Sequence, residues 1–126
     1  MTHPDRNTLS DDAFRQEWRA WLTDNVPQKI RRPIDRLRGN EMRDWLRLTA
    51  RDGWRAPGWP RTAGGMGLSV GKQMIFFEEL DAHGVARILD VGVSMLGPVL
   101  LQYGTAAQQA FYLPQILSCE HLWCQG

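Results

Sequence analysis

The sequence predicts an all-α domain of about five or six helices, interrupted by one long loop rich in glycine, proline and tryptophan. Three observations support this prediction. Apolar residues recur at helical spacing along most of the chain. Residues that favour helix N-termini precede several of these stretches. Only residues 121–125 alternate enough to suggest a strand.

The first predicted helix follows Ser10, whose side chain can accept a hydrogen bond from a free amide at a helix N-terminus. An apolar stripe then occurs at i, i+4, i+7 and i+8, formed by Phe14, Trp18, Trp21 and Leu22. The helix is expected to end before Pro27. Residues 1–12 are expected to form a flexible leader, and residues 13–120 the helical domain.

A second helix is expected after Asn40, a good N-cap, and Gly53 stands where a C-cap glycine belongs. Residues 53–67 then contain five glycines and two prolines, which predicts a long loop. Loops of this length are usually functional or packed by their own side chains. Trp54 and Trp59 can supply that packing.

Ser69 can cap a third helix, which is expected to run toward Gly84. A fourth helix is predicted over residues 88–103. Pro98 should kink or break it, because proline has no backbone N–H.

Thr105 and Gln108 fit a capping box at the start of a fifth helix. This helix is expected to end near Leu113, because Pro114 suits the first position of a short sixth turn. The tail, residues 121–125, is the one candidate strand.

Composition excludes several classes of partner. The net charge is +1 and the basic residues are interleaved with acidic ones, so nucleic-acid binding is not expected. The longest uncharged apolar stretch, residues 91–104, is too short to span a membrane. Residues 1–12 are polar and acidic, unlike a signal peptide, and two cysteines make no disulfide framework. A cytoplasmic location is the natural expectation.

The run Gly64-Gly65-Met66-Gly67 allows two interpretations. It could cradle a phosphate before a helix N-terminus, or it could form a tight structural turn. It lacks the GxxxxGK[ST] pattern and the preceding strand of a nucleotide site, so a turn is favoured.

No catalytic residue and no metal site can be assigned from the sequence. Four residues of metal-ligating types lie within six positions: Cys119, Glu120, His121 and Cys124. Their spacing is at the edge of the usual zinc range and no second pair completes four ligands, so buried cysteines and a solvent-facing histidine are favoured. Glu78 and Glu79 are adjacent on a helix and point about 100° apart, so they cannot form an acid/base dyad. They are expected to face solvent or to pair with arginines.

An ordered series of short motifs resembles the N-terminal helical domain of acyl-CoA dehydrogenases. The series consists of Gly53-Trp54 through Trp59-Pro60, Gly64-Gly65-x-Gly67, Phe77-Glu78-Glu79-Leu80, Gly97-Pro98, Tyr103-Gly104-Thr105-x-x-Gln108, Leu113-Pro114 and Trp123-Cys124-Gln125-Gly126. The residues around Gly97-Pro98 and those of the C-terminal motif are most similar to bacterial members that act on larger or unusual acyl-CoAs.

The resemblance implies an FAD enzyme that oxidises an acyl-CoA thioester to the 2,3-enoyl-CoA. Residues 121–126 would be the truncated start of the middle β-domain, and Trp123, Cys124, Gln125 and Gly126 the start of its flavin site. The helix around residues 91–101 would help wall the acyl-tail pocket. The family's catalytic base lies in its C-terminal bundle, so this chain alone is expected to be inactive and not to bind FAD unaided.

The resemblance also implies partners. These are acyl-CoA bound by the complete enzyme, the middle and C-terminal domains or a partner subunit, and a homo-oligomeric assembly. Two alternatives remain open: a stand-alone helical interaction module, and a non-catalytic subunit of a split acyl-CoA dehydrogenase.

Overall fold

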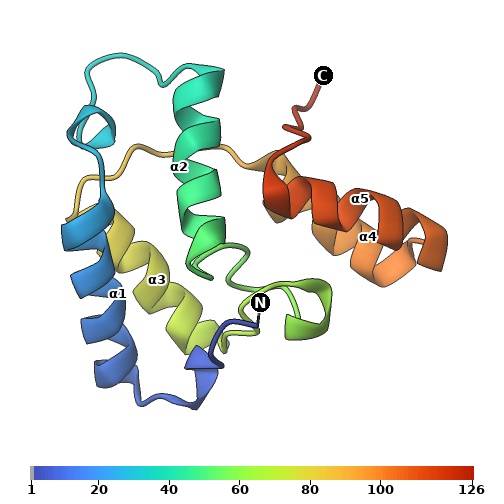
Figure 1. Cartoon of the computed structure of the whole chain (residues 1–126), viewed down its shortest axis with the longest axis horizontal. Coiled ribbons are helices and arrows are strands. Elements are labelled where there is room, and N and C mark those ends of the chain that lie inside the picture. The colour runs from blue at the N-terminus through green and yellow to red at the C-terminus, as the bar shows by residue number, and fades with distance from the viewer. Residues whose placement is uncertain (1) are drawn as a thin grey trace.

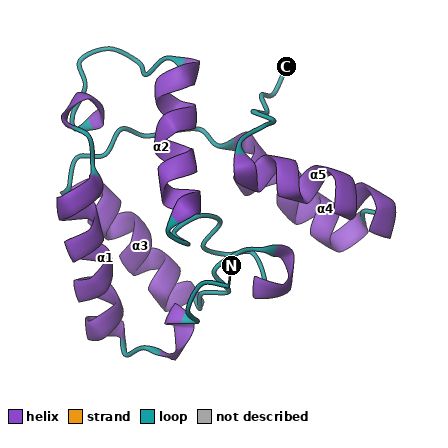
Figure 2. Ribbon diagram, viewed as in Figure 1, coloured by secondary structure: helices purple, strands orange, loops and turns teal. Residues whose placement is uncertain are grey.

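The computed structural model describes residues 2–126 and confirms the all-α fold (Figures 1 and 2). Its five α-helices are α1 (Asp11–Asn25), α2 (Gly39–Arg51), α3 (Val70–Ala82), α4 (Gly97–Tyr103) and α5 (Ala106–Ser118). A π-helical turn, Gly92–Leu96, leads directly into α4. Short 3-10 turns occupy Arg6–Thr8, Gln28–Ile30 and Arg61–Ala63. No strand forms within residues 2–126.

The helices form two groups (Figure 1): α1, α2 and α3 lie together, and α4 and α5 form a pair to one side. The larger core fills the first group, where Trp18 lies between two other rings. Its ring centroid is 4.4 Å from that of Trp54 and 4.6 Å from that of Phe76. A smaller core lies against the α4–α5 pair and consists of Ala56, Trp59, Leu100, Leu113 and Ile116. The loop after α2 therefore supplies one tryptophan to each core.

Helix ends predicted from local sequence are confirmed at four places. Ser10 accepts from Ala13 N–H, and Ser69 accepts from Lys72 N–H. Thr105 and Gln108 form the reciprocal capping box. After α2, Gly53 adopts a left-handed φ of +77°, which closes the helix C-terminus in a Schellman arrangement.

Three predicted helix boundaries are wrong. The N-cap of α2 is Arg38 rather than Asn40, because the Glu41 carboxylate accepts from Arg38 N–H at 2.7 Å. The fourth helical segment begins at Val91, and residues 88–90 precede it as irregular backbone. Pro114 lies inside α5 and does not start a sixth turn. Because Pro114 is exposed, water can reach the carbonyl that it leaves without a donor.

The two ends of the chain differ in how they are held. Residues 121–125 form no strand, because the described part of the chain offers no partner strand for their backbone. In the expected leader, Met1 lies outside the described residues, but Arg6 is buried. Its guanidinium lies 3.7 Å from the centroid of the Trp54 ring and 2.8 Å from the Glu17 carboxylate. At least this part of the leader is packed on the core.

Candidate functional site

The glycine run forms a tight turn whose backbone amides are already bonded. Every amide from Gly64 to Leu68 donates to a carbonyl of the same loop, at 2.8–3.1 Å. Gly64 and Gly67 have left-handed φ angles of +88° and +62°, which favour glycine. No amide in this stretch is left to cradle a phosphate, so the structure favours the turn.

The same loop holds the start of the fourth helical segment through Arg55. This guanidinium is buried and donates to the Asp90 carboxylate at 2.6 Å. It also donates to the carbonyls of Ile116 and Leu117 at the C-terminal end of α5, where a positive charge interacts favourably with the helix dipole. Asp90 in turn caps the segment by accepting from Val93 N–H. Arg55 thus joins three separate parts of the chain.

Trp59 is the second attachment between the loop and this segment. Its side chain is buried, and its indole N–H donates to the Val93 carbonyl at 2.9 Å. Gly97 lets the ring approach the helix: a Cβ there would overlap Trp59, with Cη2 only 2.8 Å away. We refer to Arg55 and Trp59 together as the loop clamp.

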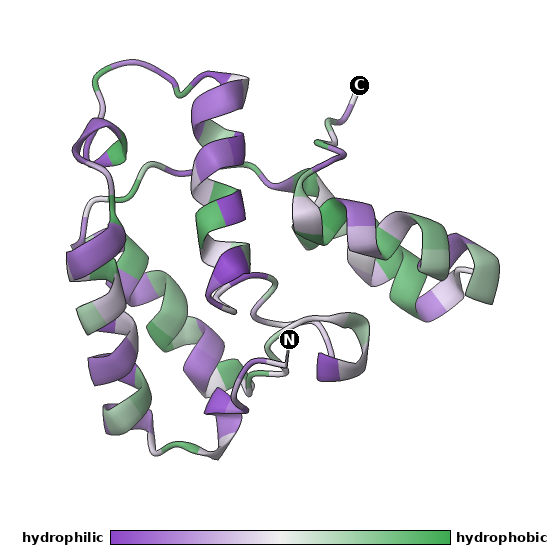
Figure 3. Ribbon diagram, in the orientation of Figure 1, coloured by the Kyte–Doolittle hydropathy of each residue, from purple (hydrophilic) through white to green (hydrophobic). Residues whose placement is uncertain are grey.

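The helical segment that the loop clamp holds presents an apolar face. Met95 and Val99, four residues apart, are 45% and 55% exposed, and Tyr103 continues the same row. Figure 3 shows that α4 and much of α5 are apolar, whereas α2 is mostly hydrophilic. Isolated exposed apolar residues are common on proteins, whereas apolar residues gathered in one row are more typical of binding surfaces and domain interfaces.

A groove of about 760 Å³ lies beside the start of this segment. Its lining combines aromatic and aliphatic side chains of α1, α2 and α3 with residues 54–57 and 85–90 of two connecting loops, and Leu89, Val93 and Ser94 line the end next to the π turn. Its volume is in the range typical of small-molecule sites.

The residues predicted to start a flavin site lie at the other side of the π turn. A Cβ on Gly92 would be 3.3 Å from Cδ1 of Trp123, whose ring also packs edge-on against Tyr112 with centroids 5.8 Å apart. Trp123 is 36% exposed, and Cys124, Gln125 and Gly126 are exposed. Within residues 2–126, no hydrogen bond joins residues 122–126 to the rest of the chain. The structure therefore brings the predicted flavin edge next to the predicted pocket wall.

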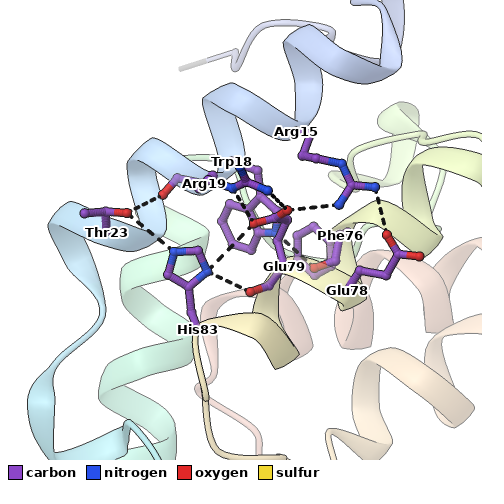
Figure 4. Close-up of polar contacts among 8 residues, drawn as sticks. All are labelled: Arg15, Trp18, Arg19, Thr23, Phe76, Glu78, Glu79 and His83. Atoms are coloured by element: carbon purple, nitrogen blue, oxygen red, sulfur yellow. Dashed lines mark hydrogen bonds and ion pairs between the residues drawn. The ribbon is translucent and has the colours of Figure 1, made fainter.

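The buried carboxylate Glu79 belongs to an ion-pair network, not to a catalytic centre (Figure 4). It is 2% exposed, and its oxygens accept from Arg19 at 2.7 and 3.0 Å and from Arg15 at 2.9 Å. These hydrogen bonds, chiefly those from Arg19, lower the pKa of Glu79 against the opposing effect of burial. The expected pairing with arginines is present, but the expectation did not include burial. The pairing joins α1 to α3.

Among the described residues, no group of three or more His, Cys, Asp or Glu side chains is placed to hold a metal. Cys119 is fully buried in the larger core, where desolvation raises the pKa of its thiol, whereas Cys124 is exposed. A protonated thiol is a poor metal ligand. None of the helices in residues 2–126 combines the length and apolar character needed to span a bilayer.

Comparison with known proteins gives consistent matches. Residues 8–120 match the family model for the N-terminal domain of acyl-CoA dehydrogenase. The chain is 38% identical over 122 residues to acyl-CoA dehydrogenase IpdE1 of Mycolicibacterium smegmatis, a match that covers 90% of this chain and 31% of the relative. It is 31% identical over 114 residues to FadE26 of Mycobacterium tuberculosis, covering 86% and 28% of the two chains.

Two solved structures are also similar. The steroid ACAD Tcur3481-Tcur3483 aligns with a TM-score of 0.75 and 33% identity over 89% of this chain and 29% of that one. The ChsE4-ChsE5 complex from Mycobacterium tuberculosis aligns with a TM-score of 0.70 and 30% identity, over 86% and 27% of the two chains. This chain spans about a third of the length of the curated relatives it matches.

Proposed function

The chain belongs to the acyl-CoA dehydrogenase family through its N-terminal domain, residues 8–120, and from this premise we propose that it is the N-terminal part of a flavin-dependent acyl-CoA dehydrogenase. In this role it forms part of the wall around the acyl group and the edge of the flavin site. The observation that carries the proposal is the apolar row of Met95, Val99 and Tyr103, which lies on the segment that the loop clamp holds and whose Gly92 is next to Trp123.

The chemistry of these residues suits a wall better than a catalytic centre. Oxidation of a thioester at its α and β carbons needs a carboxylate base for the α-proton, and Glu79 is the one buried carboxylate among residues 2–126. Two arginines hold it and lower its pKa, which makes it a weak base. The base is therefore expected outside residues 2–126, and the domain contributes binding and exclusion of water.

FAD, when bound, would accept the hydride from the β carbon. Residues 122–126 fit its edge, because they form no hydrogen bonds elsewhere in the described chain and Trp123 offers an exposed aromatic ring. Trp123, Cys124, Gln125 and Gly126 are the residues we propose to contact it. Their role in flavin binding remains a prediction, as does a cytoplasmic location.

The substrate we propose is an acyl-CoA with a bulky, steroid-like acyl group. One of the similar solved structures is named a steroid ACAD. The groove of about 760 Å³ beside Val93 and Ser94 is large enough for a polycyclic group. The names of both similar solved structures join two different proteins, so a second, different subunit is a more specific expectation than a homo-oligomer.

The test begins by reading the source locus past codon 126 and purifying the polypeptide that it encodes. This protein is mixed without oxygen with butanoyl-CoA or with a steroid acyl-CoA. Loss of the oxidised-flavin absorbance with either thioester supports the function. A protein that co-purifies with a second, flavin-containing chain and is active only in that complex supports the split-enzyme alternative. A protein that acquires no flavin in any complex contradicts both.

A further inference from the structure

The π turn leaves one backbone carbonyl without a donor in its own helix. Gly97 N–H bonds to the carbonyl of Gly92, five residues earlier, and so does not serve Val93 as it would in a regular α-helix. The π pattern would assign the Val93 carbonyl to the amide of residue 98. That residue is Pro98, which has no N–H.

The Trp59 indole fills this gap from another part of the chain. Its N–H donates to the Val93 carbonyl at 2.9 Å. The ring has little freedom to leave, since it is 3% exposed. Its backbone is bonded on both sides: its N–H donates to Ala56, and its carbonyl accepts from Gly67 N–H at 2.8 Å.

The segment is anchored on both sides of the π turn. Before the turn, Asp90 is bonded to the buried Arg55 at 2.6 Å. After it, Leu100 packs in the smaller core together with Trp59. A π turn contains one residue more than an α turn, so conversion to α would rotate the residues on one side by about 100° relative to the other. Met95 lies in the turn and Val99 beyond it.

We propose that Trp59 is a positioning residue for the acyl-group wall: its indole N–H replaces the backbone donor that Pro98 lacks, and it thereby holds the π turn that orients Met95 and Val99. The wall itself rests on the function proposed above. The replacement of the missing Pro98 donor by the Trp59 indole does not depend on that function, and it can be tested separately.

The first test is a double-mutant cycle of folding stability, with urea unfolding of Trp59→Phe, Pro98→Ala and the double variant. Trp59→Phe removes the indole donor, and Pro98→Ala supplies an N–H that can reach the freed carbonyl. We expect Pro98→Ala to restore the folding equilibrium constant of Trp59→Phe by about fivefold or more. If Trp59→Phe alone does not fold, the double variant should fold.

Trp54→Phe is the matched control. Trp54 is a buried tryptophan of the same loop, but its indole N–H has no hydrogen-bond partner within the described residues. It should lose stability through reduced ring volume, with no recovery from Pro98→Ala. The proposal would be overturned if Pro98→Ala restored stability equally in Trp59→Phe and Trp54→Phe, or if it restored none in Trp59→Phe.

The second test measures positioning in the active enzyme that contains this domain. Trp59→Phe should raise KM for a steroid acyl-CoA several-fold more than KM for butanoyl-CoA, with similar effects on the two kcat values. Trp54→Phe should not change the ratio of KM for the steroid acyl-CoA to KM for butanoyl-CoA. An unchanged ratio in Trp59→Phe would refute the positioning role. A wild-type enzyme that oxidises neither thioester would refute the proposed function. The double-mutant cycle of stability would still test whether the Trp59 indole replaces the donor that Pro98 lacks.

Discussion

Replacing Gly97 by alanine is expected to destabilise the protein, although Gly97 has ordinary helical φ and ψ angles. Helix propensity alone favours alanine over glycine by about 0.5–1 kcal/mol. The new Cβ, however, would overlap the buried Trp59 ring, with Cε2 only 2.5 Å away. Forcing extra atoms into a packed site costs about 1–3 kcal/mol, and displacement of the ring also weakens its bond to Val93, worth about 1 kcal/mol.

The cost of overpacking and of the weakened hydrogen bond exceeds the gain in helix propensity, so the free energy of unfolding is expected to fall by about 1–3 kcal/mol. Urea unfolding followed by circular dichroism measures it directly. With a slope of about 2 kcal/mol per molar urea, the midpoint should fall by about 0.5–1.5 M.

Gly71 is the matched control, because it lies in the first turn of α3 and a Cβ added there would meet no atom within 4 Å. Gly71→Ala should be neutral or stabilising by up to about 1 kcal/mol. A Gly97→Ala protein as stable as wild type would refute the claim that Gly97 seats the Trp59 ring. A second check combines Gly97→Ala with Trp59→Phe, where the smaller ring should leave room and reduce the added cost of the methyl group.

Two further predictions concern other contacts. Glu79→Gln should destabilise the protein by about 1–3 kcal/mol at pH 7. Because the folded-state pKa of Glu79 is lowered, its stabilising effect is complete above the unfolded-state pKa near 4.5 and is lost as pH falls through the folded-state value. Acid titration should therefore show a smaller loss of stability below about pH 4.5 in Glu79→Gln than in wild type, and parallel curves for the two proteins would contradict this. Thr105→Ala should cost about 1 kcal/mol in urea unfolding, because it removes the hydroxyl that accepts from Gln108 N–H at 3.1 Å, and Thr105→Ser should retain most of the stability if the cap is the cause.

Features set by neighbouring residues were predictable from the sequence. The caps at Ser10, Ser69 and Thr105 depend on a side chain and an amide three residues away, and all three are present. Pro114 was misassigned because its effect depends on exposure, which the local sequence does not contain. The burial of Glu79 was missed for the same reason: its arginine partners are 60 and 64 residues away.

The loop clamp could not be predicted because its contacts cross long separations. Arg55 reaches Asp90 across 35 residues and Trp59 reaches Val93 across 34. The sequence contained one indirect signal, Gly97 followed by Pro98 within an otherwise aliphatic stretch. A helical glycine permits a close neighbour and a proline leaves a carbonyl unpaired, but neither identifies which side chain responds.

Several motifs that are separate in the sequence form one unit in the structure. Gly65 lies so close to the Trp59 backbone that a Cβ there would overlap it, and Gly67 donates to the Trp59 carbonyl. Gly97 gives the ring space, and Pro98 has no N–H for the Val93 carbonyl, which the indole N–H bonds instead. A change to any one of these glycines or to the proline therefore acts through the position of one indole. The three motifs that contain Trp59, Gly65 with Gly67, and Gly97 with Pro98 are weak individually, but each meets a different steric or hydrogen-bonding requirement of the same side chain.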